Sequence, residues 1–234
     1  MEGIDFQKAN RIFTIKKNQL KMVERRGYDI EKEKPMFNYT LDNFLDVYIP
    51  YSKKQNKSLR AVLSLVYDKK DKKDEKTNKR SDRLFVYFAE EPEKPQLGIE
   101  YIIDFITEMD KFKTKNGIII SPRNLSPPAR KKLESLLGYN VNVFQENEMM
   151  YDPTEHYLVP QHRALGEEEQ RNFLQQNNLS ISNFKVILNT DMISRYYGFR
   201  PGQVIEIKRK NMYDTMVPES LDYRVVEQDV TKLV

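Results

Sequence analysis

The chain's two histidines, His156 and His162, stand six positions apart in the stretch TEHYLVPQH. Imidazole is a frequent metal ligand and a frequent catalytic base, so a close pair could hold zinc or activate a nucleophile. A spacing of six puts the rings on different faces of a helix and about 20 Å apart along a strand, unless Pro160 turns the chain. The chain has no cysteine, and no acidic cluster near the pair supplies further ligands. The pair therefore predicts no metal centre.

Other catalytic patterns are also missing from the sequence. A serine nucleophile would need one of the two histidines, and the G-x-S-x-G turn is absent. The glycines, eight in all, form neither a phosphate loop nor a dinucleotide fingerprint. The pattern closest to an active site is the pair Glu206 and Lys208, because metal-dependent nucleases use such a Glu-x-Lys pair with an upstream aspartate. Polar strand faces produce this triplet often, and the upstream Asp191 falls on a predicted helix. We expect no catalytic centre and no cofactor, with a nuclease as the alternative.

Composition limits the class of protein. The chain has 234 residues, of which 39% are hydrophobic and 32% charged, which suits one large or two modest globular domains. Its apolar runs are too short to span a bilayer. The start, MEGIDFQKANRIF, has early acids and lacks the apolar segment of a secretory signal. Absence of cysteine fits a reducing compartment. We expect a soluble intracellular protein without a membrane partner.

Positive charge is concentrated in the first third of the chain. Residues 1–80 carry 20 basic and 12 acidic side chains, whereas each of the other two thirds is slightly acidic. Part of this charge lies in DKKDKKDEKTNKRSDR (68–83), which has no apolar residue and cannot offset the entropy cost of ordering. We interpret 68–83 as a flexible insertion. A nuclear import signal or a nucleic-acid tether remain alternatives, although the interleaved acids disfavour a strong DNA tether.

The chain up to residue 150 reads as one α/β domain. Apolar residues from Ile4 to Val23 recur at helical spacing, and Gly27 ends this first helix. Two strand-like runs, 59–67 and 83–89, flank the insertion, which is then an enlarged hairpin connection. Further helices are predicted at 40–49, 98–112 and 126–137, with Thr40 and Ser126 as N-caps, and further strands at 117–121 and 141–145. Such alternation predicts a sheet covered by helices.

From residue 151 to 234 the pattern changes to a small α+β domain, with a boundary near 147–153. Helices are predicted at 166–178 and 190–198, the second capped by Thr190 and Asp191 and stopping at Gly198. Two strands, 202–210 and 221–228, close the domain.

Three stretches in this order resemble one protein family: LFVYFAEEPEKPQLGI (84–99), TEHYLVPQH (154–162) and DMISRYYGFRPGQVIEIKRK (191–210). They are similar to the fifth subunit shared by the nuclear RNA polymerases I, II and III, whose C-terminal domain has a counterpart in the archaeal RNA polymerase. The Arg26–Gly27–Tyr28 stop and the segment 126–129 also match. The resemblance implies an N-terminal jaw domain with an inactive, nuclease-like α/β core, and a C-terminal assembly domain.

The resemblance also implies partners and a compartment. The assembly domain would dock on the largest polymerase subunit, beside other subunits, and the jaw would lie near downstream double-stranded DNA and offer a surface to transcription regulators. The protein would be nuclear, or cytoplasmic or in the virion if the polymerase is viral. Departures from the family pattern, such as Met192 after Asp191 and Pro201 in the glycine loop, indicate a diverged or viral lineage.

By resemblance, two loops are expected to face DNA. One is the Glu91–Pro92 turn, and the other is the helix start at Ser126 and Pro127, with cations nearby: Arg123, Arg130, Lys131 and Lys132. The helix start has a physical rationale, because free backbone N–H groups and the helix dipole attract phosphate. Such contacts would be independent of sequence and sensitive to salt. An ordinary capped surface helix is the alternative.

For assembly we expect an interface formed by one segment near the C-terminal end: Arg195, Tyr196, Gly198, Arg200, Gly202 and the strand Val204–Lys208. Arginine and tyrosine often anchor interfaces, and an exposed edge at 203–210 could accept a strand from the partner. One of Tyr196 and Tyr197 could instead be core. His156, Leu158, Val159, Pro160 and His162 are expected to pack and hydrogen-bond inside the assembly domain. A free DNA-binding regulator is a further alternative, but no reading helix is evident.

Overall fold

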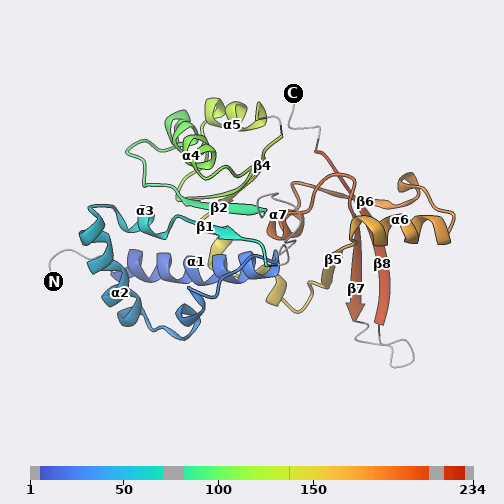
Figure 1. Cartoon of the computed structure of the whole chain (residues 1–234), viewed down its shortest axis with the longest axis horizontal. Coiled ribbons are helices and arrows are strands. Elements are labelled where there is room, and N and C mark those ends of the chain that lie inside the picture. The colour runs from blue at the N-terminus through green and yellow to red at the C-terminus, as the bar shows by residue number, and fades with distance from the viewer. Residues whose placement is uncertain (1–5, 71–81, 137, 211–218, 230–234) are drawn as a thin grey trace, which may run out of the picture. The chain divides into compact units, whose positions relative to one another are not determined.

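A computed structural model describes residues 6–70, 82–136, 138–210 and 219–229 (Figure 1). The chain divides into two compact units, Met1–Tyr151 and Asp152–Val234. Each unit has its own four-stranded sheet. No helix in the described part of the chain is both long and apolar enough to cross a membrane.

The first unit is built on a mixed sheet with strand order β1-β2-β3-β4. β1 (Leu65–Asp68) and β2 (Arg83–Phe88) are antiparallel, and β2, β3 (Asn116–Ser121) and β4 (Asn140–Gln145) are parallel. The helices are α1 (Phe6–Arg25), α2 (Leu41–Gln55), α3 (Leu59–Leu63), α4 (Ile99–Lys111) and α5 (Pro127–Glu134), with 3-10 turns η1 (Lys34–Asn38) and η2 (Glu148–Met150).

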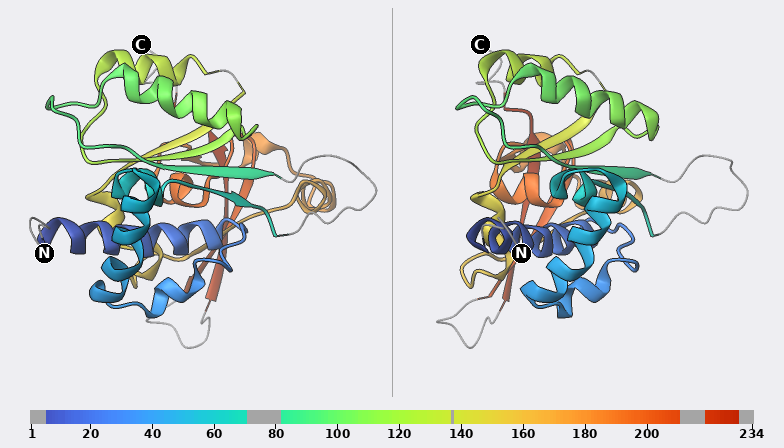
Figure 2. Two further views of the ribbon diagram at one scale, coloured as in Figure 1. Left: turned by 60° about the vertical axis from the view of Figure 1, so that its left-hand side comes forward. Right: turned by 90° about the vertical axis from the view of Figure 1, so that its left-hand side faces the viewer.

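Helices cover both faces of this sheet. α4 and α5 lie on one side and α1 on the other (Figure 2). Phe105 of α4 stacks on Phe85 of β2 with ring centroids 5.6 Å apart, inside a buried cluster that also contains Ile119. Gly117 leaves the room for this contact, because a Cβ there would lie 2.4 Å from the Phe105 ring. The alternation of strands and helices predicted from the sequence is confirmed.

The predicted helix caps and the predicted glycine stop of this unit are confirmed. Thr40 and Ser126 accept hydrogen bonds from backbone N–H groups three residues on, as N-caps do, and Gly27 has a positive φ of 82°. The antiparallel pairing of β1 with β2 confirms the hairpin that brackets the insertion, of which 71–81 lie outside the described residues. The single strand predicted at 59–67 is wrong, because its first half is helix α3, which Ser58 caps.

The second unit has strand order β5-β7-β8-β6. Its elements are η3 (Pro153–Glu155), β5 (Gln161–Ala164), α6 (Glu167–Gln176), η4 (Ile181–Asn183), β6 (Lys185–Leu188), α7 (Met192–Tyr197), β7 (Val204–Lys210) and β8 (Glu219–Glu227). β5, β7 and β8 are antiparallel neighbours, and β6 runs parallel to β8. Phe173 of α6 packs on Tyr223, and Tyr197 of α7 packs on the opposite face of the sheet, near Val226.

Two predictions for this unit are corrected. β7 pairs with both β5 and β8, so 203–210 is an interior strand and not an exposed edge. Of the two expected caps of α7, Asp191 is confirmed, because it accepts from the N–H groups of Ile193 and Ser194. Thr190 is not a cap and donates its hydroxyl to Asp229. The edge strands β5 and β6, four residues each, were not expected from the sequence.

Candidate functional site

Each of the two histidines hydrogen-bonds to the backbone of a residue two positions away. His156 is exposed, and its Nδ1 accepts from the N–H of Leu158 at 3.3 Å. Nδ1 of His162 donates to the carbonyl of Pro160 at 2.8 Å, and burial lowers the pKa of this imidazole. In the described ranges no group of three or more His, Asp or Glu side chains could hold a metal. Leu158 was expected to pack, but it is 65% exposed.

Glu206 and Lys208, the candidate nuclease pair, belong to protein ion pairs. Glu206 accepts from Arg163 at 3.2 Å and from the Tyr223 hydroxyl at 3.3 Å. Arg163 also holds Glu169 with two bonds of 2.8 Å, which lowers the pKa of the Glu169 carboxyl. Lys208 pairs with Glu219 at 2.6 Å. The Glu206 carboxylate and the Lys208 ammonium are therefore each paired with another side chain of the protein.

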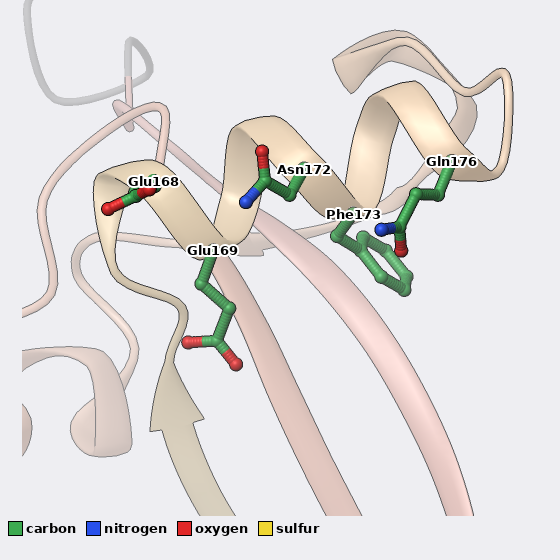
Figure 3. Close-up of a pocket in the computed structure, with 5 residues that line it drawn as sticks. All are labelled: Glu168, Glu169, Asn172, Phe173 and Gln176. Carbon is green, nitrogen blue, oxygen red and sulfur yellow. The ribbon is translucent and has the colours of Figure 1, made fainter.

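A shallow groove runs along α6 beside this network. Figure 3 shows the side chains of Glu169, Phe173 and Gln176 projecting from the helix toward the strands, with Glu168 and Asn172 completing the lining. Glu169 is occupied by Arg163, and Phe173 packs on Tyr223 at 4.6 Å. The groove brings no nucleophile together with a base.

The expected DNA-facing helix start lacks free backbone donors. Pro127 and Pro128 occupy the first two positions of α5, and proline has no N–H. The next two N–H groups, of Ala129 and Arg130, bond to the side chain and the carbonyl of Ser126. The prediction that this helix end offers N–H groups to phosphate is therefore wrong. What remains are the exposed cations that follow: Arg130, Lys131 and Lys132.

The second expected DNA loop is also corrected in part. Pro92 is buried and cannot contact DNA in this structure. Glu91 is exposed and lies between two cations, 3.9 Å from Arg123 and 3.7 Å from Lys8. These ion pairs reduce the repulsion that a carboxylate would exert on phosphate.

The expected assembly residues separate into core and surface. Tyr196 and Val204 are fully buried, so their side chains cannot form an interface, and the core interpretation holds for Tyr196. Gly198 and Gly202 have positive φ values of 70° and 86°, the left-handed conformation predicted for them. Arg200 is exposed in the turn between them.

Arg195 is half-buried at the end of α7. Its Nε donates to the carbonyl of Thr190 at 3.2 Å, and a terminal nitrogen contacts the sulfur of Met192. The exposed residues of the predicted interface are therefore Arg200 and Gly202 in the turn and Lys208 on β7.

Sequence reasoning missed two buried ionic clusters in the first unit. In one, Lys16 pairs with Glu33, and in the other Arg11 and Arg60 pair with Glu146. A signal for the first exists in the sequence, because Lys16 stands within the apolar stripe of α1, between Ile12 and Leu20. Glu146 gives no such signal, since it follows β4 in a loop-like stretch.

The described residues define a mixed α/β protein with two domains, and exposed turns and cationic surfaces rather than a catalytic cluster. A family model, RNA polymerase Rpb5, N-terminal domain, matches residues 7–109, and RNA polymerase Rpb5, C-terminal domain, matches residues 151–226. The chain belongs to the RNA polymerase Rpb5 family. It is accordingly a structural subunit of a DNA-directed RNA polymerase and assembles with other polymerase subunits.

Curated relatives align over most of their own length. An Arabidopsis thaliana protein, DNA-directed RNA polymerase subunit 5-like protein 1, is 28% identical over 91% of this chain and 92% of its own. The Caenorhabditis briggsae subunit RPABC1 of DNA-directed RNA polymerases I, II and III is 29% identical over 85% and 89%. DNA-directed RNA polymerase V subunit 5A of Arabidopsis thaliana is 25% identical over 86% and 82%.

Proposed function

We propose that this chain is a non-catalytic polymerase subunit in which residues 1–150 form the lower jaw near downstream DNA. Residues 151–234 form the assembly domain and dock on the largest subunit. The observation that carries the proposal is that both domains match the family in order along one chain, while Glu206 and Lys208 are each paired with another side chain of the protein. The jaw would keep a nuclease-like core without activity, and the protein would work in the nucleus.

The assembly contact is proposed at the turn Gly198–Gly202. Its backbone is fixed, because the N–H of Arg200 donates to the Gln203 side chain at 2.7 Å and the N–H of Gly202 donates to Val226 at 2.9 Å. A fixed turn loses little entropy on binding, which favours affinity. Arg200 projects from this turn as an exposed cation, and arginine is enriched among interface residues that contribute most to binding.

Replacing Arg200 with glutamate in the tagged full-length chain is expected to reduce recovery of the largest polymerase subunit about tenfold, in line with the loss of one anchoring arginine. The measurement is affinity purification from the native source with quantitative mass spectrometry. Arg171→Glu, the same change at an exposed position on α6, is the control and should leave recovery unchanged. Equal recovery with both variants would reject this turn as the docking surface.

Near downstream DNA, the proposed contact is the cationic surface of α5, formed by Arg130, Lys131 and Lys132. These side chains are exposed and form no ion pair within the described part of the chain. Duplex DNA would therefore find uncompensated charge there, and each phosphate contact would release counterions.

The triple variant Arg130/Lys131/Lys132→Ala is expected to assemble normally but to hold downstream DNA more weakly. The slope of log affinity against log salt should fall by about 2 to 3, one for each lost phosphate contact. Salt-dependent dissociation of the elongation complex measures it. Lys32/Lys113/Lys115→Ala removes the same charge at exposed positions elsewhere in the first unit and serves as the control. An unchanged slope in the α5 variant, with assembly intact, would remove α5 from the DNA path.

A further inference from the structure

Helix α2 carries an apolar stripe that is partly exposed. Val47 and Tyr51, one turn apart, are 48% and 50% exposed, and Pro50 between them is exposed as well. Phe44, which α2 buries, packs on Phe13 of α1 at 5.1 Å and on Tyr48 at 4.9 Å. Val47 and Tyr51 stand three and seven residues after Phe44, so they continue the same apolar side of the helix. The stripe is therefore the outer border of the core-facing side of α2, and the described part of the chain leaves about half of each of its two apolar side chains exposed.

Cations lie at the C-terminal end of this stripe. Lys53, Lys54 and Lys57 are exposed, and none forms an ion pair with a described residue. The helix dipole accounts for lysines in the last turn of a helix. It does not account for Lys57, which follows the left-handed C-cap at Asn56, nor for the apolar side chains beside the lysines.

We propose that this face of α2 binds an acidic amphipathic helix of another protein. The apolar side of such a helix would cover Val47 and Tyr51, and its carboxylates would pair with Lys53, Lys54 and Lys57. Duplex DNA would satisfy the lysines, but its phosphates would leave the apolar stripe in water, so the combination favours a protein. The inference goes beyond the proposed function and does not depend on it, because the surface lies in the first unit and the assembly contact in the second.

The probe is a fluorescent synthetic peptide with leucine on one helical face and glutamate on the other, titrated with the full-length chain and followed by anisotropy. We expect saturable binding that Val47→Ser/Tyr51→Ser weakens about tenfold or more, and that Lys53/Lys54/Lys57→Glu weakens at least as much. Circular dichroism establishes that each variant is folded.

Two matched controls carry the same chemical changes elsewhere in the first unit. Ile99→Ser/Ile103→Ser alters two side chains one turn apart on α4 that are 38% and 48% exposed, and Arg130/Lys131/Lys132→Glu reverses three exposed charges on α5. Both should change the peptide affinity less than about twofold if binding is local to α2.

Three results would overturn the proposal. One is absence of saturable binding, and another is an equal loss of affinity in the controls, which would mean unspecific charge or apolar attraction. In the third, a DNA duplex binds at α2, and this binding is lost with the lysine variant but kept with Val47→Ser/Tyr51→Ser. That result would identify a nucleic-acid surface instead.

Discussion

Replacing Lys16 with methionine is expected to lower the free energy of unfolding by about 3 to 5 kcal/mol, the range for removing one partner of a buried ion pair. Lys16 is fully buried on α1. Its ammonium lies 3.0 Å from a Glu33 carboxylate oxygen and donates to the Tyr67 hydroxyl at 2.9 Å. Methionine fills a similar volume but leaves the carboxylate inside without its cation.

The electrostatics of this cluster explain the size of the effect. Burial lowers the pKa of Lys16, and the neighbouring Glu33 carboxylate opposes that shift. Burial, together with the same carboxylate, raises the pKa of Tyr67, which therefore stays protonated and donates to Glu33 at 2.5 Å. The ammonium and the phenol thus share one carboxylate, and losing either donor leaves negative charge with less compensation.

Denaturant titration of the full-length chain, with hydrogen exchange in α1 peptides, measures the loss in the first unit. Lys131→Met, at an exposed position on α5, makes the same chemical change and should cost less than about 0.5 kcal/mol. The double variant Lys16→Met/Glu33→Gln should recover part of the loss, because no full charge then remains buried. A Lys16→Met protein as stable as the control would show that the pair contributes nothing net.

Much of the fold follows from local signals that act within a few residues. Ser126 was predicted as an N-cap and accepts from the N–H of Ala129, and Gly198 was predicted as a helix stop and has a positive φ. Such signals depend only on neighbouring backbone, so a sequence carries them in full. The 59–67 error arose where they competed, since a Ser58 cap outweighed the strand preference of the residues that follow.

The edge strands, by contrast, could not be predicted from local signals. β5, with the sequence QHRA, has no apolar alternation, and only its pairing with β7 makes it a strand. Because the pairing of β5 with β7 was not predicted, 203–210 was predicted to be an exposed edge strand. Register between distant segments is a tertiary property, which a four-residue polar stretch does not encode locally.

Two of the candidate interface residues were placed on the surface by sequence reasoning but lie in the core, for a related reason. Tyr196 and Val204 are residue types that suit both an interface and a core, and both are buried. The exposure of Arg200 was predictable, because an arginine in a turn between two glycines has no apolar surroundings to bury it. Family resemblance suggested the segment as a candidate interface, whereas the side of each element that faces solvent came only from the three-dimensional structure.

Glu146 is the second position where one substitution should have a large effect. It is buried directly after β4, and its carboxylate lies 3.0 Å from Arg11 of α1 and 2.5 Å from Arg60 of α3. Its backbone N–H donates to Ser121 at the end of β3. One carboxylate therefore joins two helices to the C-terminal edge of the parallel strands.

Glu146→Ala is expected to cost about 3 kcal/mol, because it leaves two guanidinium groups without their shared partner and Arg60 is largely buried. Glu146→Gln should cost less, since an amide oxygen can still accept one hydrogen bond although the charge is gone. Urea unfolding of the full-length chain measures both variants. The control is Glu134→Ala on the exposed side of α5, which should stay within about 0.5 kcal/mol of the original protein.

The order of the three Glu146 and Glu134 variants separates charge from packing. If charge pairing holds the helices to the sheet, Glu146→Ala is the least stable, Glu146→Gln is intermediate, and exchange protection falls in both α1 and α3. If the side chain only fills space, the nearly isosteric glutamine variant should match the original protein. High salt should change the stability of the original protein little, because a buried pair is screened much less than an exposed one.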